Sequence, residues 1–272
     1  MTPTVYQIET TEQGRVGELS ATVTGSLSGS VTLGVPADFV EDFSLYSSTA
    51  NFLTDPNSFY TAEGQNTGQL AIDADTFYTG YTKSLRYTYP SGTGTDYTIT
   101  PGHIDFTAAG VLNGAQTDIW VEYAIKFASG FTLLGNGQPG GAGLKAVQIR
   151  VSPEVGGRFG VQLTNNDSPD FDMEGPNDDY TDLFQNFPTT GIMDGNWHVI
   201  RRHVDVSNAS AITHATWIDG VFKGRKTSSG SAVTSLTALI YFNNLNKLAA
   251  SSQDLWIGYL KLWTTSPGWV DS

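Results

Sequence analysis

The first residues whose spacing suggests chemistry form a glycine-rich segment near the middle of the chain. Gly135, Gly137 and Gly140 match the G-x-G-x-x-G spacing with which dinucleotide-binding proteins hold a pyrophosphate. That chemistry needs a helix directly after the glycines, because the N-terminus of the helix binds the phosphates. Here the glycines lead into LKAVQIRV (144–151), whose pattern predicts a strand. The segment therefore predicts a wide loop between strands, and we expect no nucleotide cofactor.

A second candidate is the acidic segment from 166 to 182. Oxygen-rich segments can bind calcium, and Asp170, Asp172 and Glu174 alternate along the chain, so an extended backbone would carry all three on one side. The spacing of an EF-hand loop is missing. We expect a solvated acidic loop, and a calcium site at Asp170, Asp172 and Glu174 is the alternative.

Composition limits the partners of this chain. Acidic residues outnumber Lys plus Arg by 27 to 14, for a formal net charge of −13, so nucleic acid is not an expected partner. There is no cysteine, which excludes disulfides and thiolate chemistry. The N-terminus lacks the basic and apolar regions of a classical signal peptide, and no apolar run approaches the length of a membrane span. We therefore expect no membrane partner.

Short strands punctuated by turn residues predict the fold class. Eight strand-like runs lie at 84–90, 117–127, 144–151, 158–164, 197–206, 214–224, 237–245 and 254–263. In 117–127, alternate apolar residues predict one core face, and Glu122 on the other face is expected to be a solvated residue. No sustained helical stripe is present. The pattern predicts an all-β two-sheet sandwich or jelly roll.

Residues 1–40 differ from the rest of the chain. They are rich in Ser, Thr and Gly, and Val23, Leu27, Val31 and Leu33 form a weak period-2 pattern with little to bury. Two interpretations stay open: a mobile leader, or a β arm that pairs with a neighbouring subunit or with the edge of the domain. We expect an extended arm over 1–40 and a single domain over 41–272.

The strands between residues 80 and 265 resemble the concanavalin A-like lectin/glucanase jelly roll, a superfamily that includes laminin-G-type modules and alginate-lyase-like enzymes. The resemblance is carried by WVEYAIKFASGF (120–131), GLKAVQIRV (143–151), WHVIRRHVDV (197–206), ATWIDGVFKGR (215–225) and QDLWIGYLKLW (253–263). It implies a concanavalin A-like jelly-roll sandwich. It implies less about function, because such folds host many activities.

Alginate-lyase-like members carry the motifs R-x-E-L-R, Q-I-H and Y-F-K-A-G-x-Y-x-Q in that order. The corresponding stretches here are TKSLR (82–86), QIR (148–150) and YFNNLNK (241–247). Arginine, glutamine and tyrosine match at Arg86, Gln148 and Tyr241, whereas the family's histidine is Arg150. The resemblance and the aromatic content imply a set of carbohydrate-binding residues: Arg86, Trp120, Gln148, Arg150, Tyr241 and Asn243.

The departures bear on catalysis. β-Elimination of a polyuronate needs a group that neutralises the substrate carboxylate, a base for the C5 proton and an acid for the leaving oxygen. The resemblance implies that Arg86, Gln148 and Arg150 supply the first and Tyr241 the last. Arg150 cannot act as a base because arginine stays protonated, which leaves Tyr241 to serve both roles. No complete catalytic set is evident, so we lean towards a protein that is not an enzyme.

The first expectation is a non-enzymatic structural or decorating protein on the surface of a particle, with a virion as the leading case and with glycan affinity in addition. It would assemble as a homo-oligomer with other subunits through residues 1–40, and release by lysis would explain a virion or extracellular location without a signal peptide. Two alternatives stay open: a polysaccharide lyase that acts on a polyuronate, and a free carbohydrate-binding module whose partner is a surface polysaccharide.

Overall fold

The structure is a computed structural model of the 272-residue chain. It describes residues 35–54, 69–92, 95–98, 102–132, 143–152, 158–165, 169–174, 187–188, 192–228, 233–241, 244–247 and 249–270. Within these ranges the backbone alone is described for residues 95–98, 102–103, 143–146, 158–165, 169–174, 187–188, 226, 228, 240–241 and 244–247. Among the described residues, no helix is long and apolar enough to cross a membrane.

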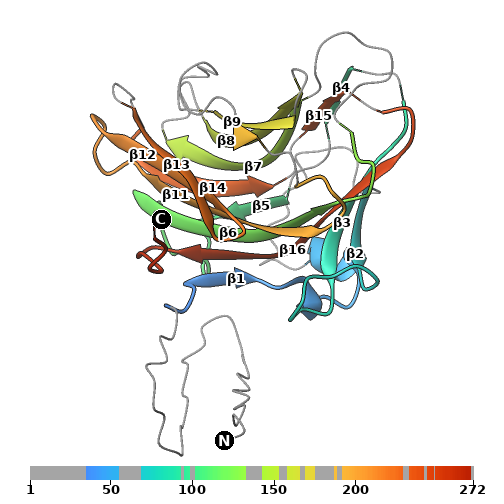
Figure 1. Ribbon diagram of the computed structural model, residues 1–272. Coiled ribbons are helices and arrows are strands. Elements are labelled where there is room, and N and C mark those ends of the chain that lie inside the picture. The colour runs from blue at the N-terminus through green and yellow to red at the C-terminus, as the bar shows by residue number, and fades with distance from the viewer. Residues whose placement is uncertain are drawn as a thin grey trace, which may run out of the picture.

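Eight described strands form an antiparallel sheet that we call sheet A. They are β1 (Phe39–Glu41), β2 (Leu70–Asp73), β3 (Ser84–Tyr89), β6 (Asp118–Phe127), β11 (Trp197–Asp205), β12 (Ile212–Ile218), β13 (Val221–Ser228) and β16 (Gln253–Trp263). Their order across the sheet is β13-β12-β11-β6-β16-β3-β2, and β1 pairs with β16. Sheet A is the lower layer in Figure 1.

The upper layer in Figure 1 is sheet B. Its described strands are β4 (Thr95–Thr98), β5 (Gly102–Asp105), β7 (Gly143–Ser152), β8 (Arg158–Asn165), β9 (Pro169–Glu174), β10 (Phe187–Pro188), β14 (Ser235–Tyr241) and β15 (Asn244–Lys247). The order is β10-β9-β8-β7-β14-β5, and β15 pairs with β4 and β7. The described helical elements are short: η1 (Phe43–Leu45) and α1 (Thr49–Thr54).

The core lies between the two sheets. The alternate residues of β6 are all at most 2% exposed: Ile119, Val121, Tyr123, Ile125 and Phe127. Residues of β7 and β14 face them from sheet B and are at most 3% exposed: Val147, Ile149, Val151, Leu236 and Leu239. Period-2 alternation thus gives each strand one apolar face, and the two faces exclude water together. The predicted all-β two-sheet sandwich is confirmed.

Two predicted strand boundaries were wrong. The run 214–224 is a hairpin, because Asp219 and Gly220 turn the chain with φ values of 51° and 77° between β12 and β13. An Asp-Gly pair favours the turn that needs positive φ at both positions. The run 237–245 is also interrupted, since β14 ends at Tyr241 and β15 begins at Asn244.

The end of the expected arm pairs with the domain. β1 straddles the expected boundary at residue 40 and lies antiparallel to β16, with Phe39 opposite Leu262 and Glu41 opposite Leu260. Phe39 is 1% exposed. Residues 1–34, including the alternating residues of the arm, lie outside the described residues. Pairing with the domain is therefore seen for residues 39–41 alone, and the partner strand β16 lies inside sheet A rather than at its edge.

His198 clamps the hairpin turn onto β11. Its Nδ1 lies 2.7 Å from Asp219 Oδ2, and its Nε2 lies 3.1 Å from Asp194 Oδ1. Burial disfavours the charged ring, but the hydrogen bonds and charges of Asp219 and Asp194 outweigh burial and raise the pKa of His198. The protonated ring therefore stabilises the fold. This contribution is complete below the pKa of an unfolded histidine and is lost as pH rises through the raised folded-state pKa.

The pH dependence of this clamp gives a first prediction. In His198→Gln, the loss of unfolding free energy relative to the unsubstituted protein should be largest below about pH 6.5, the ordinary histidine pKa, and should shrink on the alkaline side. Urea unfolding of both proteins between about pH 5 and about pH 9 measures this difference while other titrating groups cancel. A loss that does not vary with pH would contradict the clamp.

Candidate functional site

β7 runs through the middle of sheet B and carries two of the expected site residues on its outward face. Val147, Ile149 and Val151 face the core, so the intervening Gln148 and Arg150 point away from sheet A. Gln148 is 1% exposed, whereas Arg150 is only partly buried. The charge that solvent or a ligand can reach on this part of β7 therefore belongs to Arg150.

The register adds a second arginine next to Arg150. β7 pairs with β8 so that Arg150 lies opposite Arg158, and on its other side Arg150 lies opposite Ala238 of β14. Like charges directly opposite each other on neighbouring strands are destabilising by themselves. This rung of sheet B places two arginine positions directly opposite each other.

A bulge in β7 brings a lysine position to the same face. The register with β8 shifts between Lys145 and Val147. Without the shift, Lys145 would share the core face of Val147. With it, Lys145 pairs with Gln162 and Gln148 pairs with Gly160, two residues away on β8, so both positions belong to the outward face.

Behind β7, a fully buried arginine connects the two sheets. Arg202 of β11 is 0% exposed and donates from Nη1 to the carbonyl of Val147 over 3.0 Å. Its Nε lies 3.2 Å and its Nη2 3.0 Å from Nε2 of His214 on β12. Val147 directly precedes Gln148 and borders the bulge. Arg202 therefore fixes the backbone on which the outward residues of β7 stand.

Burial sets the charge states in this polar core. It lowers the pKa of Arg202 to about 10, so the guanidinium stays charged at neutral pH. Burial, together with the charge of Arg202, holds the pKa of His214 well below its usual value, so that its ring is neutral and Nε2 accepts hydrogen bonds. Burial also raises the pKa of Tyr123. The cluster thus carries one cation among neutral groups.

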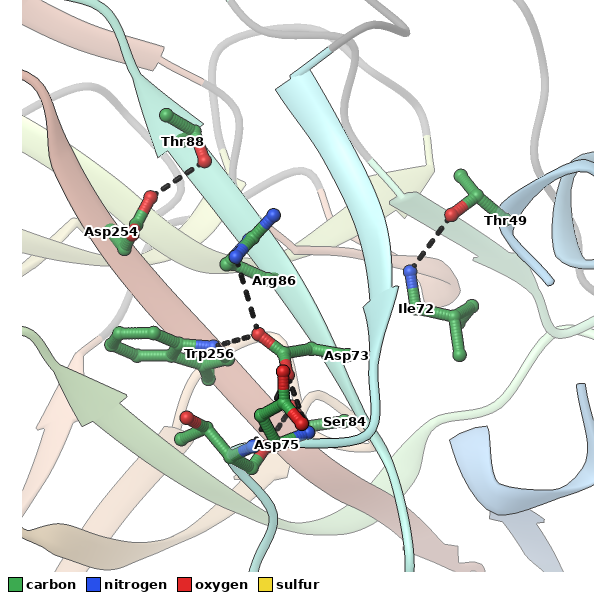
Figure 2. Close-up of polar contacts among 10 residues, drawn as sticks. Thr49, Ile72, Asp73, Asp75, Ser84, Arg86, Thr88, Asp254 and Trp256 are labelled. Atoms are coloured by element: carbon green, nitrogen blue, oxygen red, sulfur yellow. Dashed lines mark hydrogen bonds and ion pairs between the residues drawn. The ribbon is translucent and has the colours of Figure 1, made fainter.

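Arg86 does not join this face, because β3 belongs to sheet A. Figure 2 shows Arg86 beside Asp73 and Trp256: Arg86 Nη1 lies 3.5 Å from Asp73 Oδ2, which also accepts a 3.0 Å hydrogen bond from Trp256 Nε1. The whole thickness of the sandwich separates the outward face of sheet A from the face that carries Gln148 and Arg150. The structure therefore does not bring together the set implied by the three family motifs.

Trp120 and Glu122 also lie on the outward face of sheet A, and both are buried at 7% exposure. Glu122 accepts hydrogen bonds from Nε of Arg201 over 2.7 Å and from the hydroxyl of Tyr259 over 2.8 Å. The expectation of a solvated glutamate was wrong, because other parts of the chain cover this face. Trp120 is one of a group of tryptophans rather than a neighbour of Gln148.

The remaining expected site residues are described only in part. Tyr241 ends β14 and pairs with Val147, while Ile240 is the residue that pairs with Gln148. The side chain of Tyr241 and the whole of Asn243 lie outside the described residues. Sequence reasoning missed Arg158 and Arg202. The sequence does contain a sign that Arg202 is buried, because Arg202 falls on the same face of β11 as the apolar residues two positions before and after it.

The acidic segment is a strand in part, which corrects the expected loop. Residues 169–174 form β9, which pairs with β8 and β10. The side chains of Asp170, Asp172 and Glu174 lie outside the described residues, so the calcium alternative stays a prediction. In the part of the chain that the structure describes, no group of three His, Asp or Glu side chains is arranged to hold a metal ion.

Comparison with known proteins finds similarity in structure alone. No family model and no curated protein matches the sequence. An endo-β-1,4-glucuronan lyase from the fungus Trichoderma reesei is 10% identical with a TM-score of 0.53, over 86% of this chain and 100% of that one. Alginate lyase Aly36B is 14% identical with a TM-score of 0.57, over 82% and 95%. A variant of that enzyme in complex with an alginate tetrasaccharide is 14% identical to this chain, with a TM-score of 0.54. At such identities the likeness shows the fold.

Proposed function

We propose that this concanavalin A-like jelly roll binds an acidic polysaccharide, a polyuronate, along the outward face of sheet B. The observation that carries the proposal is the rung of β7 and β8 at which Arg150 lies opposite Arg158. Guanidinium groups bind carboxylates through paired, charge-assisted hydrogen bonds, so two arginine positions on one rung suit a uronate.

The overall charge makes this local arrangement necessary. A chain with a net charge of −13 repels a polyanion, so binding needs basic residues gathered on one face. Lys145, Arg150 and Arg158 supply three basic positions on neighbouring parts of β7 and β8. The amide of Gln148 lies between the first two along β7. The two lyases that share the fold are named for acting on a glucuronan and on alginate, both of which are polyuronates.

Arginine substitutions test this site. Arg150→Ala should weaken the binding of alginate or glucuronan oligosaccharides at least about tenfold, equivalent to about 1.4 kcal/mol. Arg86→Ala is the matched control, because Arg86 is a partly exposed arginine on the other sheet, and it should leave binding unchanged. Isothermal titration calorimetry measures both. Equal losses in the two variants would instead favour the set implied by the family motifs, and unchanged binding in Arg150→Ala would refute the site.

β-Elimination of the bound polyuronate is the second candidate, favoured by the activities named for the two lyases of the same fold. Arg150 cannot be the base, so the reaction would depend on Tyr241, whose position pairs with the core-facing Val147 and would have to reach the substrate from the end of β14. A rise in ultraviolet absorbance from the new conjugated double bond, lost in Tyr241→Phe, would demonstrate it. A flat trace with intact binding would leave a carbohydrate-binding module without activity.

Decoration of a particle surface, with a virion as the leading case, stays a proposal based on the Ser, Thr and Gly content of residues 1–40. In that role the arm would pair with other copies of the chain beyond the point where β1 joins β16. Light scattering of the full chain should then give the mass of a homo-oligomer. A monomer at high concentration would argue against assembly through the arm, without affecting polysaccharide binding.

A further inference from the structure

Four tryptophans gather on the outward face of sheet A. Trp217 of β12, Trp120 of β6 and Trp263 of β16 form what we call the tryptophan cage, and they are 1%, 7% and 6% exposed. Trp120 and Trp263 lie directly opposite each other in the register of their strands. A sheet face that carried three such side chains bare to water would be an apolar patch of the kind that marks a binding surface.

The fourth tryptophan occupies the cage. Trp269 lies with its ring centroid 5.3 Å from that of Trp120, 5.5 Å from that of Trp217 and 5.5 Å from that of Trp263. The guanidinium of Arg201 lies 5.1 Å from the same ring. The cage is therefore already shaped to hold one ring-sized group, and the chain supplies that group itself.

The segment that carries Trp269 is held loosely. We call residues 264–270 the cover segment. It begins at Thr264, which donates twice to Asp38 Oδ2, and Trp217 Nε1 donates over 2.8 Å to the carbonyl of Val270. Among the described residues, no backbone–backbone hydrogen bond joins residues 265–270 to either sheet. The ring contacts of Trp269 rather than backbone hydrogen bonds therefore hold the cover segment, so a group that replaces the indole in the cage would release it.

Two polar atoms beside the cage lack the hydrogen bonds that burial normally requires. Nε1 of Trp120 and Nδ1 of His203 are buried and have no hydrogen-bond partner among the described residues. The two rings are stacked, with centroids 3.8 Å apart. His203 Nε2 lies 2.7 Å from the carboxylate of Asp118, so a neutral ring leaves Nδ1 as an acceptor. A buried donor on Trp120 and a buried acceptor on the ring stacked against it match the needs of a hydroxyl group, which accepts one hydrogen bond and donates another.

We propose that the tryptophan cage is a second carbohydrate site, which takes a pyranose ring of an uncharged oligosaccharide in the place of Trp269. A pyranose is close to an indole in size and brings the hydroxyls that Trp120 and His203 lack. Arg201 is paired with Glu122 over 2.7 Å, and the carboxylate of Asp118 accepts a 2.7 Å hydrogen bond from His203 Nε2, so no free cation faces the cage among these residues. A neutral sugar therefore fits this face better than a polyanion. The site is independent of polyuronate binding on sheet B.

The main test removes the occupant. Calorimetry with three neutral probes, the β-1,4-linked hexasaccharides of glucose, mannose and xylose, should show that Trp269→Ala binds at least one of them about tenfold tighter than the unsubstituted protein, because the sugar no longer competes with the indole. Adding Trp120→Phe to this variant, which removes the buried donor, should abolish the gain. Adding Arg150→Ala to Trp269→Ala instead should leave the gain in affinity unchanged, because Arg150 lies on the other sheet. The proposal would be overturned if Trp269→Ala bound none of the three probes, or if it bound each of them no tighter than the unsubstituted protein does.

A second measurement uses the unsubstituted protein, in case Trp269→Ala folds poorly. With the probe at saturation, deuterium exchange at the amides of Thr264 and Gly268, which donate to Asp38 and Ser266, should become faster as Trp269 leaves the cage, while exchange in β7 stays the same. Sugar binding that leaves the cover segment as protected as before would place the sugar elsewhere and would also overturn the proposal.

Discussion

Replacing Arg202 with alanine is expected to lower the free energy of unfolding by about 3–5 kcal/mol. Arg202 is fully buried and donates to the carbonyl of Val147 and to Nε2 of His214. The alanine leaves both acceptors without this donor in a place that water does not reach, and it opens a cavity where the guanidinium lay. Both effects lower the free energy of unfolding, and both act at the contact that joins the two sheets behind β7.

Two further variants separate the causes. Arg202→Met keeps most of the side-chain volume but none of the hydrogen bonds, so it should fall between the alanine variant and the unsubstituted protein. Arg201→Ala, one residue away on the outward face, removes an arginine that is 32% exposed but also the partner of the buried Glu122, and should cost about 1–3 kcal/mol. Urea unfolding of all three provides the values. A loss in Arg202→Ala no larger than that in Arg201→Ala would show that the buried contacts contribute little.

The second large effect is expected at Gly258, where alanine should cost about 2 kcal/mol of unfolding free energy. Gly258 lies in β16 where its register with β6 shifts. A Cβ atom there would come within 2.7 Å of the Cβ of Tyr78, 3.3 Å of the ring of Trp197 and 3.4 Å of the Cβ of Ala124. The first distance is too short for carbon atoms, and Tyr78 cannot yield without moving its backbone.

Gly114→Ala is the matched control, because a Cβ atom at that position has nothing within 4 Å. It should change the unfolding free energy by no more than about 0.5 kcal/mol. Thermal and urea unfolding compare the two variants directly. If Gly258→Ala were as stable as Gly114→Ala, the segment around Tyr78 would have to adapt freely, and close packing would not be the reason for glycine in β16.

Local pattern accounts for what could be predicted. Alternation in 117–127 assigned the core face of β6, because the side-chain period of a strand is a property of the strand itself. Alternation failed at Asp219, because it does not reveal a turn inside an apolar run. The chain turns there with a φ of 51°, so one predicted strand is in fact two.

The candidate site depended on contacts that lie far apart in the sequence. Arg86 and Gln148 both follow strand patterns, but nothing local says that β3 joins sheet A while β7 joins sheet B. The register between β7 and β8 brought Arg158 next to Arg150, and it shifted Lys145 to the outward face. Such pairings follow from which strands exchange hydrogen bonds across the sheet, which a single strand does not encode.

By itself, then, the sequence determined the all-β class, most strand positions and the side of each strand that faces the core, since these follow from local alternation and turn residues. Only the tertiary structure decided which strands share a sheet, which outward faces are covered and which polar groups meet. The strand pattern places Trp120 and Glu122 on the face opposite the core, yet distant parts of the chain bury them. In the sequence Arg202 is one charged residue among others. In the fold it lies between the sheets and donates a hydrogen bond to the backbone of β7. Burial is a property of the whole packed chain, and it determines which of these residues water and ligands can reach.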